Sequence, residues 1–420
     1  MTNENVRKQL ESRGRQERLE GHSSQPGFDV DKAIARVNDL AQAQAIAQSR
    51  RLHPYRLEWI HQLEVRYRDN PGKPVIHLSD LPRKTAIRLS EDGLSMLEEL
   101  WKSIKRITGT REAKRLGLEN IYECGVCRRY TYITLESLHR VRQLIDWSVD
   151  SLEQCVTHIK CHKNNWPKEI QPRLPFDFLN EFGVAILGYY TESKHGTAAF
   201  TNKDMELHRF VRKAIEQTVG QMRVKTTKYE DVSETYWSLL LRTLIKIAGI
   251  DTNPRQKIAN NPAPLWLFST SLSNISAYLR ALWTAEGQPE SMRVVQSNVV
   301  PSLKTYSSSI ARHPAVTPFN NLPKQAQVMV RQKPSLLLAS AVLLHRSLGI
   351  DVGFRPVYAY LEHRNEPTVM WTIEITSNEE INKFAKLINF DTTDKQQRLK
   401  TRLKSPSSPS PFFLSKNIAA

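Results

Sequence analysis

The strongest constraint on the fold is a helical stretch in the second half of the chain that ends in an acidic residue. Ala277, Ala281 and Ala285 recur at every fourth position, so they form a helix face that lacks bulky side chains and lets another helix approach closely. Glu286 then places a carboxylate on the last turn, and Gly287 is a typical C-terminal stop. Because the helix dipole already puts negative charge at that end, this carboxylate favours a neighbouring cation such as a divalent metal, although an ordinary exposed Glu also fits.

A second stretch of the same character lies earlier in the chain. Gly183–Ser193 is apolar, contains small residues and carries Glu192 near its end. Each of the two stretches is followed by mixed segments and then by an apolar helix that closes on Gly-Ile-Asp, over Leu239–Asp251 and Leu336–Asp351. This shared order predicts an internal duplication.

Leu279–Gly287 resembles the LAGLIDADG motif position for position, with Glu286 at the acidic place. The region Pro175–Leu399 is similar to a two-motif, single-chain LAGLIDADG homing endonuclease. The first motif departs from the pattern, since Ser193 replaces the final Gly and Gly188 lies one residue closer to the acid. Further stretches that fit the resemblance are Phe200–Asp204, Pro264–Trp266, Trp371–Ile375, Ile381–Phe384 and Asn389-Phe390.

The resemblance implies an α+β fold, built as a pseudo-symmetric pair of αββαββα-type halves over residues 175–265 and 266–400. Antiparallel sheets of the two halves would form a saddle along the major groove of DNA. It also implies that Glu192 and Glu286 are the catalytic metal ligands and that a basic residue assists, for which Lys257 and Lys395 are candidates. The strand residues with side chains suited to base edges or phosphates are Arg223, Lys225, Lys228, Arg293, Gln296 and Asn298.

Phosphodiester hydrolysis needs an in-line water, neutralisation of charge on the phosphate and stabilisation of the leaving oxygen. Divalent ions held by carboxylates serve all three needs, and Mg²⁺, or Mn²⁺ in its place, combines a few carboxylates with water and phosphate oxygens. One Glu from each of two helix ends that meet near a phosphate would satisfy this requirement. Two such halves would cut both strands of the duplex.

The formal net charge of +17 indicates an anionic partner, with double-stranded DNA as the leading candidate and intron RNA as an alternative. The polar N-terminus does not resemble a signal peptide, and the apolar stretch near Leu336–Leu344 is too short to cross a bilayer, so no membrane partner is expected. Four cysteines do not make a disulfide framework, so we expect a reducing, cytoplasmic location. The internal pseudo-two-fold predicts a monomer.

The two ends of the chain are predicted to lie outside the duplicated region. Residues 1–75 are expected to form a polar helical arm, with helices near Asp31–Arg51 and His53–Asn70, followed by a linker at Pro71–Pro74. Residues 401–420 are rich in Ser and Pro and are expected to be disordered.

Residues 76–165 are predicted to form a small all-α domain. Ser90 precedes an amphipathic segment as a helix cap would, and Ile133–Ile145 and Ser148–Ile159 are expected to be helices. The short helix Arg111–Leu116 and the turn Gly117-Leu118 resemble a DNA-binding helix-turn-helix module. The side chains expected on or near its recognition element are Asn120, Tyr122, Arg128 and Arg129.

The same segment carries a metal-like signature. Cys124 and Cys127 have the spacing of a zinc ligand pair, which His158 and Cys161 could complete as a structural site. The alternative needs no metal and treats these cysteines as small, half-buried residues.

Three functions remain open at this point. The leading one is a site-specific double-strand DNA endonuclease that depends on Mg²⁺ or Mn²⁺. The second is a DNA-binding protein that has lost cleavage, which the irregular first motif favours. The third is an RNA-binding splicing maturase on the same scaffold.

Overall fold

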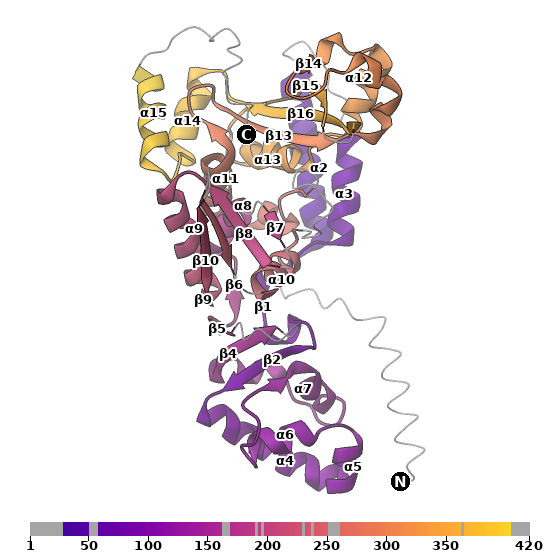
Figure 1. Ribbon diagram of the computed structural model, residues 1–420, viewed down its shortest axis with the longest axis vertical. Helices are drawn as coiled ribbons and strands as arrows, with labels where there is room; N and C mark the ends of the chain where they lie inside the picture. The colour runs from indigo at the N-terminus through magenta and orange to yellow at the C-terminus, as the bar shows by residue number, and fades with distance from the viewer. Residues whose placement is uncertain are drawn as a thin grey trace. The chain divides into compact units, whose positions relative to one another are not determined.

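The computed structural model describes residues 28–49, 58–161, 169–189, 192–194, 197–228, 232–236, 239–250, 261–362 and 365–404. Helices are combined with antiparallel sheets, as the α+β prediction requires (Figure 1). The chain forms two compact units, which we call unit 1 (Ile76–Phe176 with Gly220–Met222) and unit 2 (Val30–Val75, Asp177–Val219 and residues 223–404). The chain passes between them at the short strands β1 (Val75–Ile76) and β6 (Phe176–Asp177), and again on either side of Gly220–Met222. None of the helices in the described ranges combines the length and the apolar character needed to cross a bilayer.

Unit 1 packs one long helix and several short ones against a sheet. Its helical elements are η1 (Leu78–Asp80), α4 (Glu91–Thr108), α5 (Thr110–Arg115), α6 (Glu119–Gly125), α7 (Leu135–Val141) and η2 (Val149–Cys155). Its strands are β2 (Thr85–Leu89), β3 (Ile133–Thr134), β4 (Val156–Cys161), β5 (Glu169–Pro172) and β9 (Gly220–Gln221), in the order β3-β2-β4-β5-β9 with antiparallel pairing.

This sheet corrects the prediction of an all-α domain. The expected helix over Ser148–Ile159 is instead η2 followed by strand β4. The residues that enter β4 are Val156, Thr157 and Ile159, which are β-branched and favour an extended backbone, and Ile159 is buried in the sheet. The helix predicted after Ser90 is confirmed as α4, whose first turn is capped by the Ser90 hydroxyl accepting from the Gly93 amide.

Unit 2 contains two similar runs of elements. The first run is α8 (Glu181–Tyr189), β7 (Glu192–Lys194), β8 (Thr197–Asn202), α9 (Met205–Thr218), β10 (Val224–Lys228), β11 (Val232–Tyr236) and α10 (Leu239–Ile247). The second is η4 (Leu265–Ser269), α11 (Leu272–Glu286), β12 (Gly287–Gln288), β13 (Arg293–Val299), η5 (Pro301–Ser309), β14 (Thr317–Pro318), η6 (Phe319–Asn321), α12 (Lys324–Arg331), α13 (Leu336–Ser347), β15 (Gly353–Leu361), β16 (Pro367–Glu374), α14 (Asn378–Leu387) and α15 (Thr393–Lys404).

The two sheets of unit 2 have corresponding strand orders. The first sheet is β10-β11-β8-β7, and the second is β12-β13-β16-β15-β14. In both sheets, the last strand of the run lies in the interior: β11 lies between β8 and β10, and β16 lies between β13 and β15. Strand β14 is an addition at one edge of the second sheet. The two Gly-Ile segments do not occupy equivalent places, however. The first follows α10, after the last strand of its run, whereas the second follows α13, before β15.

Each of these sheets has one face covered by helices. In the first sheet, Phe200 and Glu234 lie on the covered face, where they contact His208 and Arg212 of α9. In the second sheet, Phe354 and Trp371 stack on the covered face, and Trp59 contacts Phe354 edge-on with ring centroids 6.2 Å apart. Since side chains alternate along a strand, the intervening residues point to the opposite, open faces.

The two helices predicted near Asp31–Arg51 and His53–Asn70 are present, but they pack into unit 2, so the described part of residues 1–75 is not a polar arm outside it. They are α2 (Val30–Ser49) and α3 (Glu58–Asp69). Leu63 is fully buried, the Tyr67 ring lies 6.1 Å from that of Phe268, and the buried Gln44 side chain donates to the Val352 carbonyl at 3.0 Å. The packing face of these helices consists of apolar residues that are interspersed with charged residues in the sequence.

Candidate functional site

The centre of unit 2 is a close pair of helices, α8 and α11. A Cβ atom on Gly188 would lie 2.5 Å from the Tyr278 carbonyl oxygen and 2.8 Å from the Ala281 Cβ, so the two backbones touch at this point. Near the helix starts, the Asn274 side chain donates to the Leu179 carbonyl at 2.7 Å. The Asn274 contact joins the starts of the two helices, and the Gly188 contact joins the end of α8 to the middle of α11. The helices therefore run parallel, and α8 ends about one turn before the C-terminal end of α11.

Of the three alanines predicted to permit this approach, Ala281 lies at the contact and is fully buried. Ala277 is buried as well, and Ala285 is half-buried. Gly188 is required because any side chain there would displace the α11 backbone. The irregular glycine of the first motif is thus the residue at the helix contact.

Glu286 is the last residue of α11, and its side chain is exposed. In the described part of the chain, its carboxylate forms no hydrogen bond or ion pair. Protein surrounds the group on most sides despite its access to water, which raises the pKa of the Glu286 carboxyl, and the nearby Lys395 ammonium opposes this rise. An ionisable group that combines solvent access with a crowded environment is suited to bind a cation.

Lys395 closes the end of the same helix. Its ammonium donates to the Thr284 carbonyl at 2.7 Å and to the Gly287 carbonyl at 2.8 Å. Burial lowers the pKa of Lys395 to about 8, and Glu286 is the main group that acts against this fall. Of the two lysines predicted from the sequence, this one lies beside Glu286, whereas Lys257 lies outside the described residues.

The sequence did not single out the group that joins the two helix ends. Asp391, in the segment before α15, accepts a hydrogen bond from the Tyr189 hydroxyl at the end of α8, and its amide donates to Thr284 Oγ1 at 2.8 Å. Burial raises the pKa of the Asp391 carboxyl, while Tyr189 and Arg280 lower it. Arg280 further binds the segment by donating to the Ile388 carbonyl at 2.7 Å. Only its position beside Asn389-Phe390, a stretch that fits the resemblance, could have pointed to Asp391.

Glu192 is not on a helix. The predicted helical stretch Gly183–Ser193 ends at Tyr189 as α8, and Glu192 is the first residue of strand β7, where it pairs with Ala199. Its side chain lies outside the described residues. The backbone nevertheless places Glu192 soon after the end of α8, the helix that packs on α11.

Two of the three basic residues predicted for the first sheet lie toward its open face. Lys225 pairs across the sheet with Thr235 and is exposed, and Arg223 precedes it by two residues on the same side of the chain. Lys228 is also exposed, but its strand parity places it on the opposite face.

In the second sheet, only one of the three residues predicted to contact DNA, Arg293, lies on the open face. Its guanidinium donates there to Gln288 at 3.1 Å. Gln296 pairs with Trp371 and so faces the helices. Asn298 is 3% exposed, and its amide donates to the carbonyls of Lys333 and Pro334, so it is a structural residue and has no surface to offer DNA.

The residues of unit 1 that were predicted to recognise DNA are partly engaged in contacts within the protein. Asn120 is exposed and donates to Ser137 Oγ at 3.2 Å, and the half-buried Tyr122 ring packs on Trp101. Arg129 pairs with Glu123 at 3.1 Å, and Arg128 lies 3.9 Å from Glu91, both beyond the end of α6.

The predicted zinc ligands are not brought together among the described side chains. Cys124 is buried, donates to the Tyr130 carbonyl and has a pKa raised by burial to about 11, which disfavours the thiolate that zinc needs. Cys127 is exposed, and His158 lies on β4 with its ring beside Thr157. The side chain of Cys161 lies outside the described residues.

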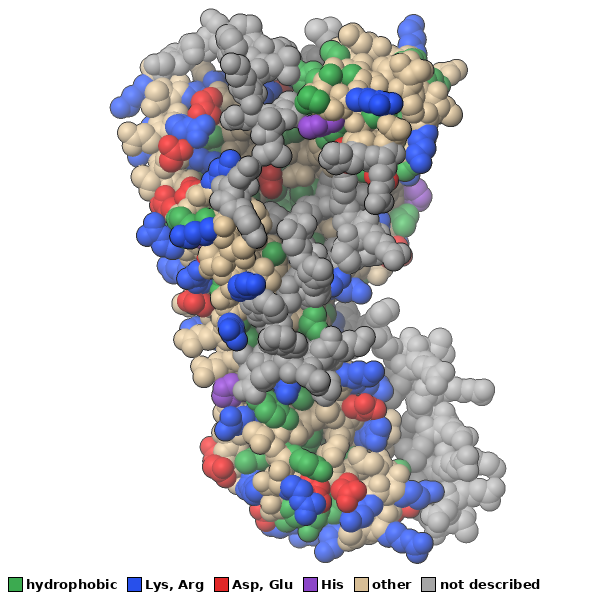
Figure 2. Space-filling model, viewed as in Figure 1, with side chains coloured by type: hydrophobic (Ala, Val, Ile, Leu, Met, Phe, Trp, Pro, Cys, Tyr) green, Lys and Arg blue, Asp and Glu red, His purple; other side chains and the backbone are tan. Residues whose placement is uncertain are grey.

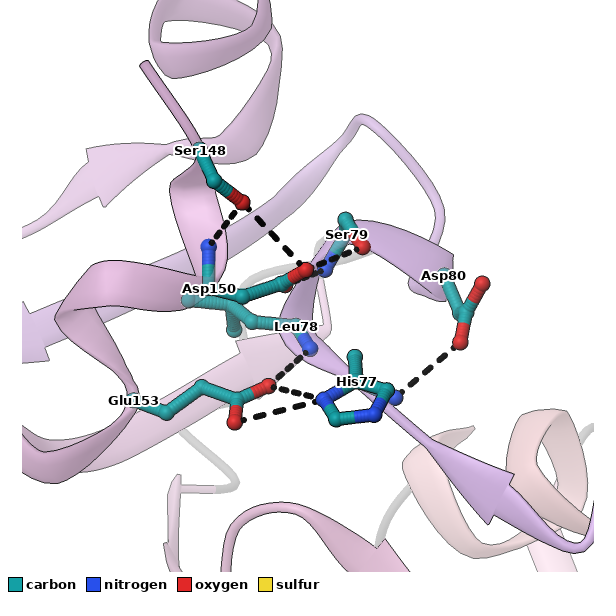
Figure 3. Close-up of polar contacts among 7 residues, drawn as sticks. All are labelled: His77, Leu78, Ser79, Asp80, Ser148, Asp150 and Glu153. Atoms are coloured by element: carbon teal, nitrogen blue, oxygen red, sulfur yellow. Dashed lines mark hydrogen bonds and ion pairs between the residues drawn. The ribbon is translucent and has the colours of Figure 1, made fainter. Parts of the chain in front are cut away.

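Another group in unit 1 has metal-binding residue types: His77, Asp150 and Glu153 (Figure 3). The carboxylates of Asp150 and Glu153 already accept hydrogen bonds from residues of η1. Glu153 accepts from the Leu78 amide at 2.8 Å and contacts the His77 ring, and Asp150 accepts from both the amide and the hydroxyl of Ser79 at 2.7 and 2.8 Å. This arrangement fixes η1 on η2 and is explained without a metal.

No protein-family model matches this sequence, and a comparison with curated proteins finds no relative. Among solved structures, the chain is similar to I-DmoI in complex with DNA and Ca, with 13% identity over 53% of this chain and 98% of that chain and a TM-score of 0.29. It is also similar to mesophilic variants of the homing endonuclease I-DmoI (12% identity, 50% and 97% coverage, TM-score 0.28). A third match is I-DmoI in complex with DNA and Mn (14%, 50% and 97%, TM-score 0.26).

Proposed function

We propose that this protein is a site-specific DNA endonuclease of the LAGLIDADG type, acting as a monomer with one acid from each half. The observation that carries the proposal is the parallel contact of α8 and α11, which presents Glu286 as an exposed, unpartnered carboxylate beside Lys395. A charge of this kind at the negative end of a helix dipole costs stability, so a role outside folding accounts for it best.

The residues present fit a divalent cation. Glu286 offers a free carboxylate open to water, and Mg²⁺ or Mn²⁺ needs one or two such ligands together with waters and phosphate oxygens. Glu192, in the segment that follows α8, is the proposed second ligand. When bound, the ion would neutralise charge on the phosphate and activate a water.

The protein groups around Glu286 have distinct tasks in this proposal. Lys395 holds the last carbonyls of α11, and its charge favours the ionised form of Glu286. Tyr189, Asp391 and Thr284 tie the ends of α8 and α11 to one segment and so fix the spacing of the two acids.

Duplex DNA would lie along the open faces of the two sheets of unit 2. These faces carry Lys225 and Arg293, whose side chains can bind phosphates or base edges. On the face seen in Figure 2, Lys and Arg side chains are dispersed among acidic ones in each unit.

The test is cleavage of a plasmid library with randomised inserts in the presence of Mg²⁺, followed by sequencing of the linearised molecules. The native protein should enrich one family of sites, and Glu286→Gln should lower its cleavage by more than about a hundredfold while it still binds the enriched site. Glu216→Gln changes an exposed acid on α9 and is the matched control, with cleavage unchanged. Equal cutting by Glu286→Gln would refute the proposal.

A second candidate is a DNA-binding protein that does not cleave. It is favoured by the position of Glu192, which begins strand β7 and does not end a helix as Glu286 does. The same library separates the candidates, since selection for binding would then recover a defined site that selection for cleavage does not.

A further inference from the structure

Unit 1 contains a basic pocket that the proposed nuclease site does not use. It has a volume of about 460 Å³. Its lining comes from the turn before β2, the end of α5, helix α7 and the segment that follows α7. Its charged walls are Arg83, Arg115, Arg140 and Glu136, so cations outnumber the single carboxylate. A hollow with this balance selects an anion.

The arginines differ in how much of their donor capacity is engaged. Arg115 gives two N–H groups to Glu112, at 2.9 and 2.7 Å, and Arg140 gives one to Glu136 at 2.8 Å. Within the described residues, the exposed Arg83 guanidinium pairs with no carboxylate. A guanidinium has five N–H donors, so all three retain donors for a ligand, and the two acids hold Arg115 and Arg140 in place.

The fold also keeps Arg140 over the pocket. A Cβ atom on Gly117 would lie 2.2 Å from Arg140 Nη1, and Gly117 has a φ of +71°. The guanidinium therefore occupies the space that a side chain on this turn would take. The turn predicted as part of a helix-turn-helix thus serves to seat an arginine at the pocket wall.

The remaining walls suit a base more than a bare anion. Leu116 and Leu144 are apolar, and Gln143 offers an amide that can both donate and accept. Burial, followed by the charge of Arg83, lowers the pKa of His139, so its ring is neutral and can stack or accept a hydrogen bond. A volume in the range of small-molecule sites leaves room for much more than one phosphate group.

We infer that this pocket binds one nucleotide, with its phosphate on Arg83 and Arg140 and its base between the leucines and Gln143. The nucleotide is either free or part of a nucleic-acid strand, since both present the same phosphate and base. A nucleotide within a strand would make unit 1 a second nucleic-acid contact, and that reading alone rests on the proposed function. Arginine planes are common stacking platforms for unpaired bases.

Binding by the full-length protein is measured in metal-free buffer, so that cleavage plays no part. The probes are adenosine 5′-monophosphate, by calorimetry, and a short single-stranded oligodeoxynucleotide, by fluorescence anisotropy. Arg83→Ala should weaken binding about tenfold, as expected for the loss of a charge-assisted hydrogen bond. Gln143→Glu keeps the size of the side chain but adds a negative charge, and it should weaken binding at least as much.

Arg106→Ala is the matched control, because it removes an exposed arginine of α4 that does not line the pocket. The inference is supported if the pocket variants, and not the control, lose binding to one or both probes. Loss with adenosine 5′-monophosphate identifies a free nucleotide as a ligand, and loss with the oligodeoxynucleotide identifies a nucleotide within a strand. No binding of either probe by the native protein, or equal losses in Arg83→Ala and Arg106→Ala, overturns it. These binding results do not depend on whether Glu286→Gln affects cleavage. A failure of the nuclease proposal is therefore distinguished from a failure of this inference.

Discussion

The ammonium nitrogen of Lys395 lies 2.7 Å from the carbonyl oxygen of Thr284, so a side chain of α15 closes the C-terminal end of α11. The same group reaches the Gly287 carbonyl and lies near Glu286, with which it interacts electrostatically. Its positive charge offsets both the negative end of the helix dipole and the acid placed there. The cation that the sequence led us to expect beside Glu286 is thus in part supplied by the protein itself.

The first prediction concerns the charge of Lys395. Because its pKa is about 8, the ammonium loses its proton as the pH rises through that value. We expect the cleavage rate at saturating DNA to fall over this range, by about tenfold once the charge is lost. Lys395→Met should show the low rate at all pH values.

Lys395→Arg separates charge from shape. An arginine stays protonated throughout this range, so its rate, even if lower than that of the native protein, should not decline near pH 8. An identical alkaline decline in the Arg variant would show that another group causes it.

The helix pair and its acid could be predicted because they depend on local pattern. Alanines at every fourth position and a terminal Glu-Gly are enough to predict a close contact and a carboxylate at a helix end, and Ala281 and Glu286 are placed accordingly. Asp391 could not be found in this way. Its role arises from contacts with Tyr189 and Thr284, which are distant in sequence and meet only when the chain is folded.

Unit 1 shows why a helical pattern can mislead. The residues around Val156 and Ile159 alternate poorly, and their capping serine at position 148 does begin a helical turn, η2. The chain then continues as β4 because pairing with β2 and β5 on both sides satisfies its backbone groups. Such pairing depends on strands elsewhere in the chain and is not visible in the segment itself.

The second prediction tests the helix contact. Gly188→Ala would place a methyl group 2.5 Å from the Tyr278 carbonyl oxygen, and backbone atoms of α11 cannot yield without separating the helices. Alanine favours a helix by up to about 1 kcal/mol, but overpacking costs about 1–3 kcal/mol, so we expect net destabilisation together with reduced cleavage. Thermal unfolding of unit 2 and the cleavage rate measure the two effects.

The comparison for Gly188→Ala is Gly353→Ala in β15. There the nearest atom to an added Cβ is Glu374 Cγ, at 3.2 Å, which belongs to a flexible side chain that can move. We expect a smaller loss of stability and little change in cleavage. A Gly188 variant as stable and active as the Gly353 variant would contradict the close backbone contact.

The third prediction is an acid sensitivity built into α13. His345 is fully buried, accepts from the Trp283 indole at 2.8 Å and contacts the Ala341 carbonyl at 2.7 Å through Nδ1. Burial lowers the pKa of His345 to about 4, so between this value and its ordinary pKa only the unfolded chain takes up the proton. Stability is therefore lost as the pH falls through this window, by about 3 kcal/mol in total.

The check is the free energy of unfolding of unit 2, from denaturant titrations followed by Trp fluorescence, between about pH 7 and pH 4. His345→Gln removes the titrating group and keeps an acceptor for Trp283. The variant should start less stable and lose less on acidification. Parallel pH curves for the two proteins would assign the acid sensitivity to other groups.

The fourth prediction concerns the carboxylates that hold η1. Asp150→Ala leaves the amide and hydroxyl of Ser79 without their acceptor, and hydrogen bonds to charged groups contribute about 1.5–3 kcal/mol, so unit 1 should lose stability in that range. Ser148→Ala removes only a weaker 3.4 Å contact to the same carboxylate, along with a cap, and should cost less. If Mg²⁺ raised the melting temperature of unit 1 and Asp150→Ala abolished that rise, a metal role would replace the structural one.

The fifth prediction separates two residues of β13 that looked alike in the sequence. Arg293 lies on the open face of the second sheet, whereas the Asn298 amide is buried against the turn before α13. Arg293→Ala should weaken DNA binding and reduce the slope of log affinity against log salt by about one, without changing the melting temperature. Asn298→Ala should leave the salt slope unchanged but destabilise unit 2 by about 1–3 kcal/mol, because two carbonyls lose their buried donor. Equal salt slopes for Arg293→Ala and the native protein would place the DNA on another surface, since a guanidinium that leaves the phosphate count unchanged does not contact the backbone.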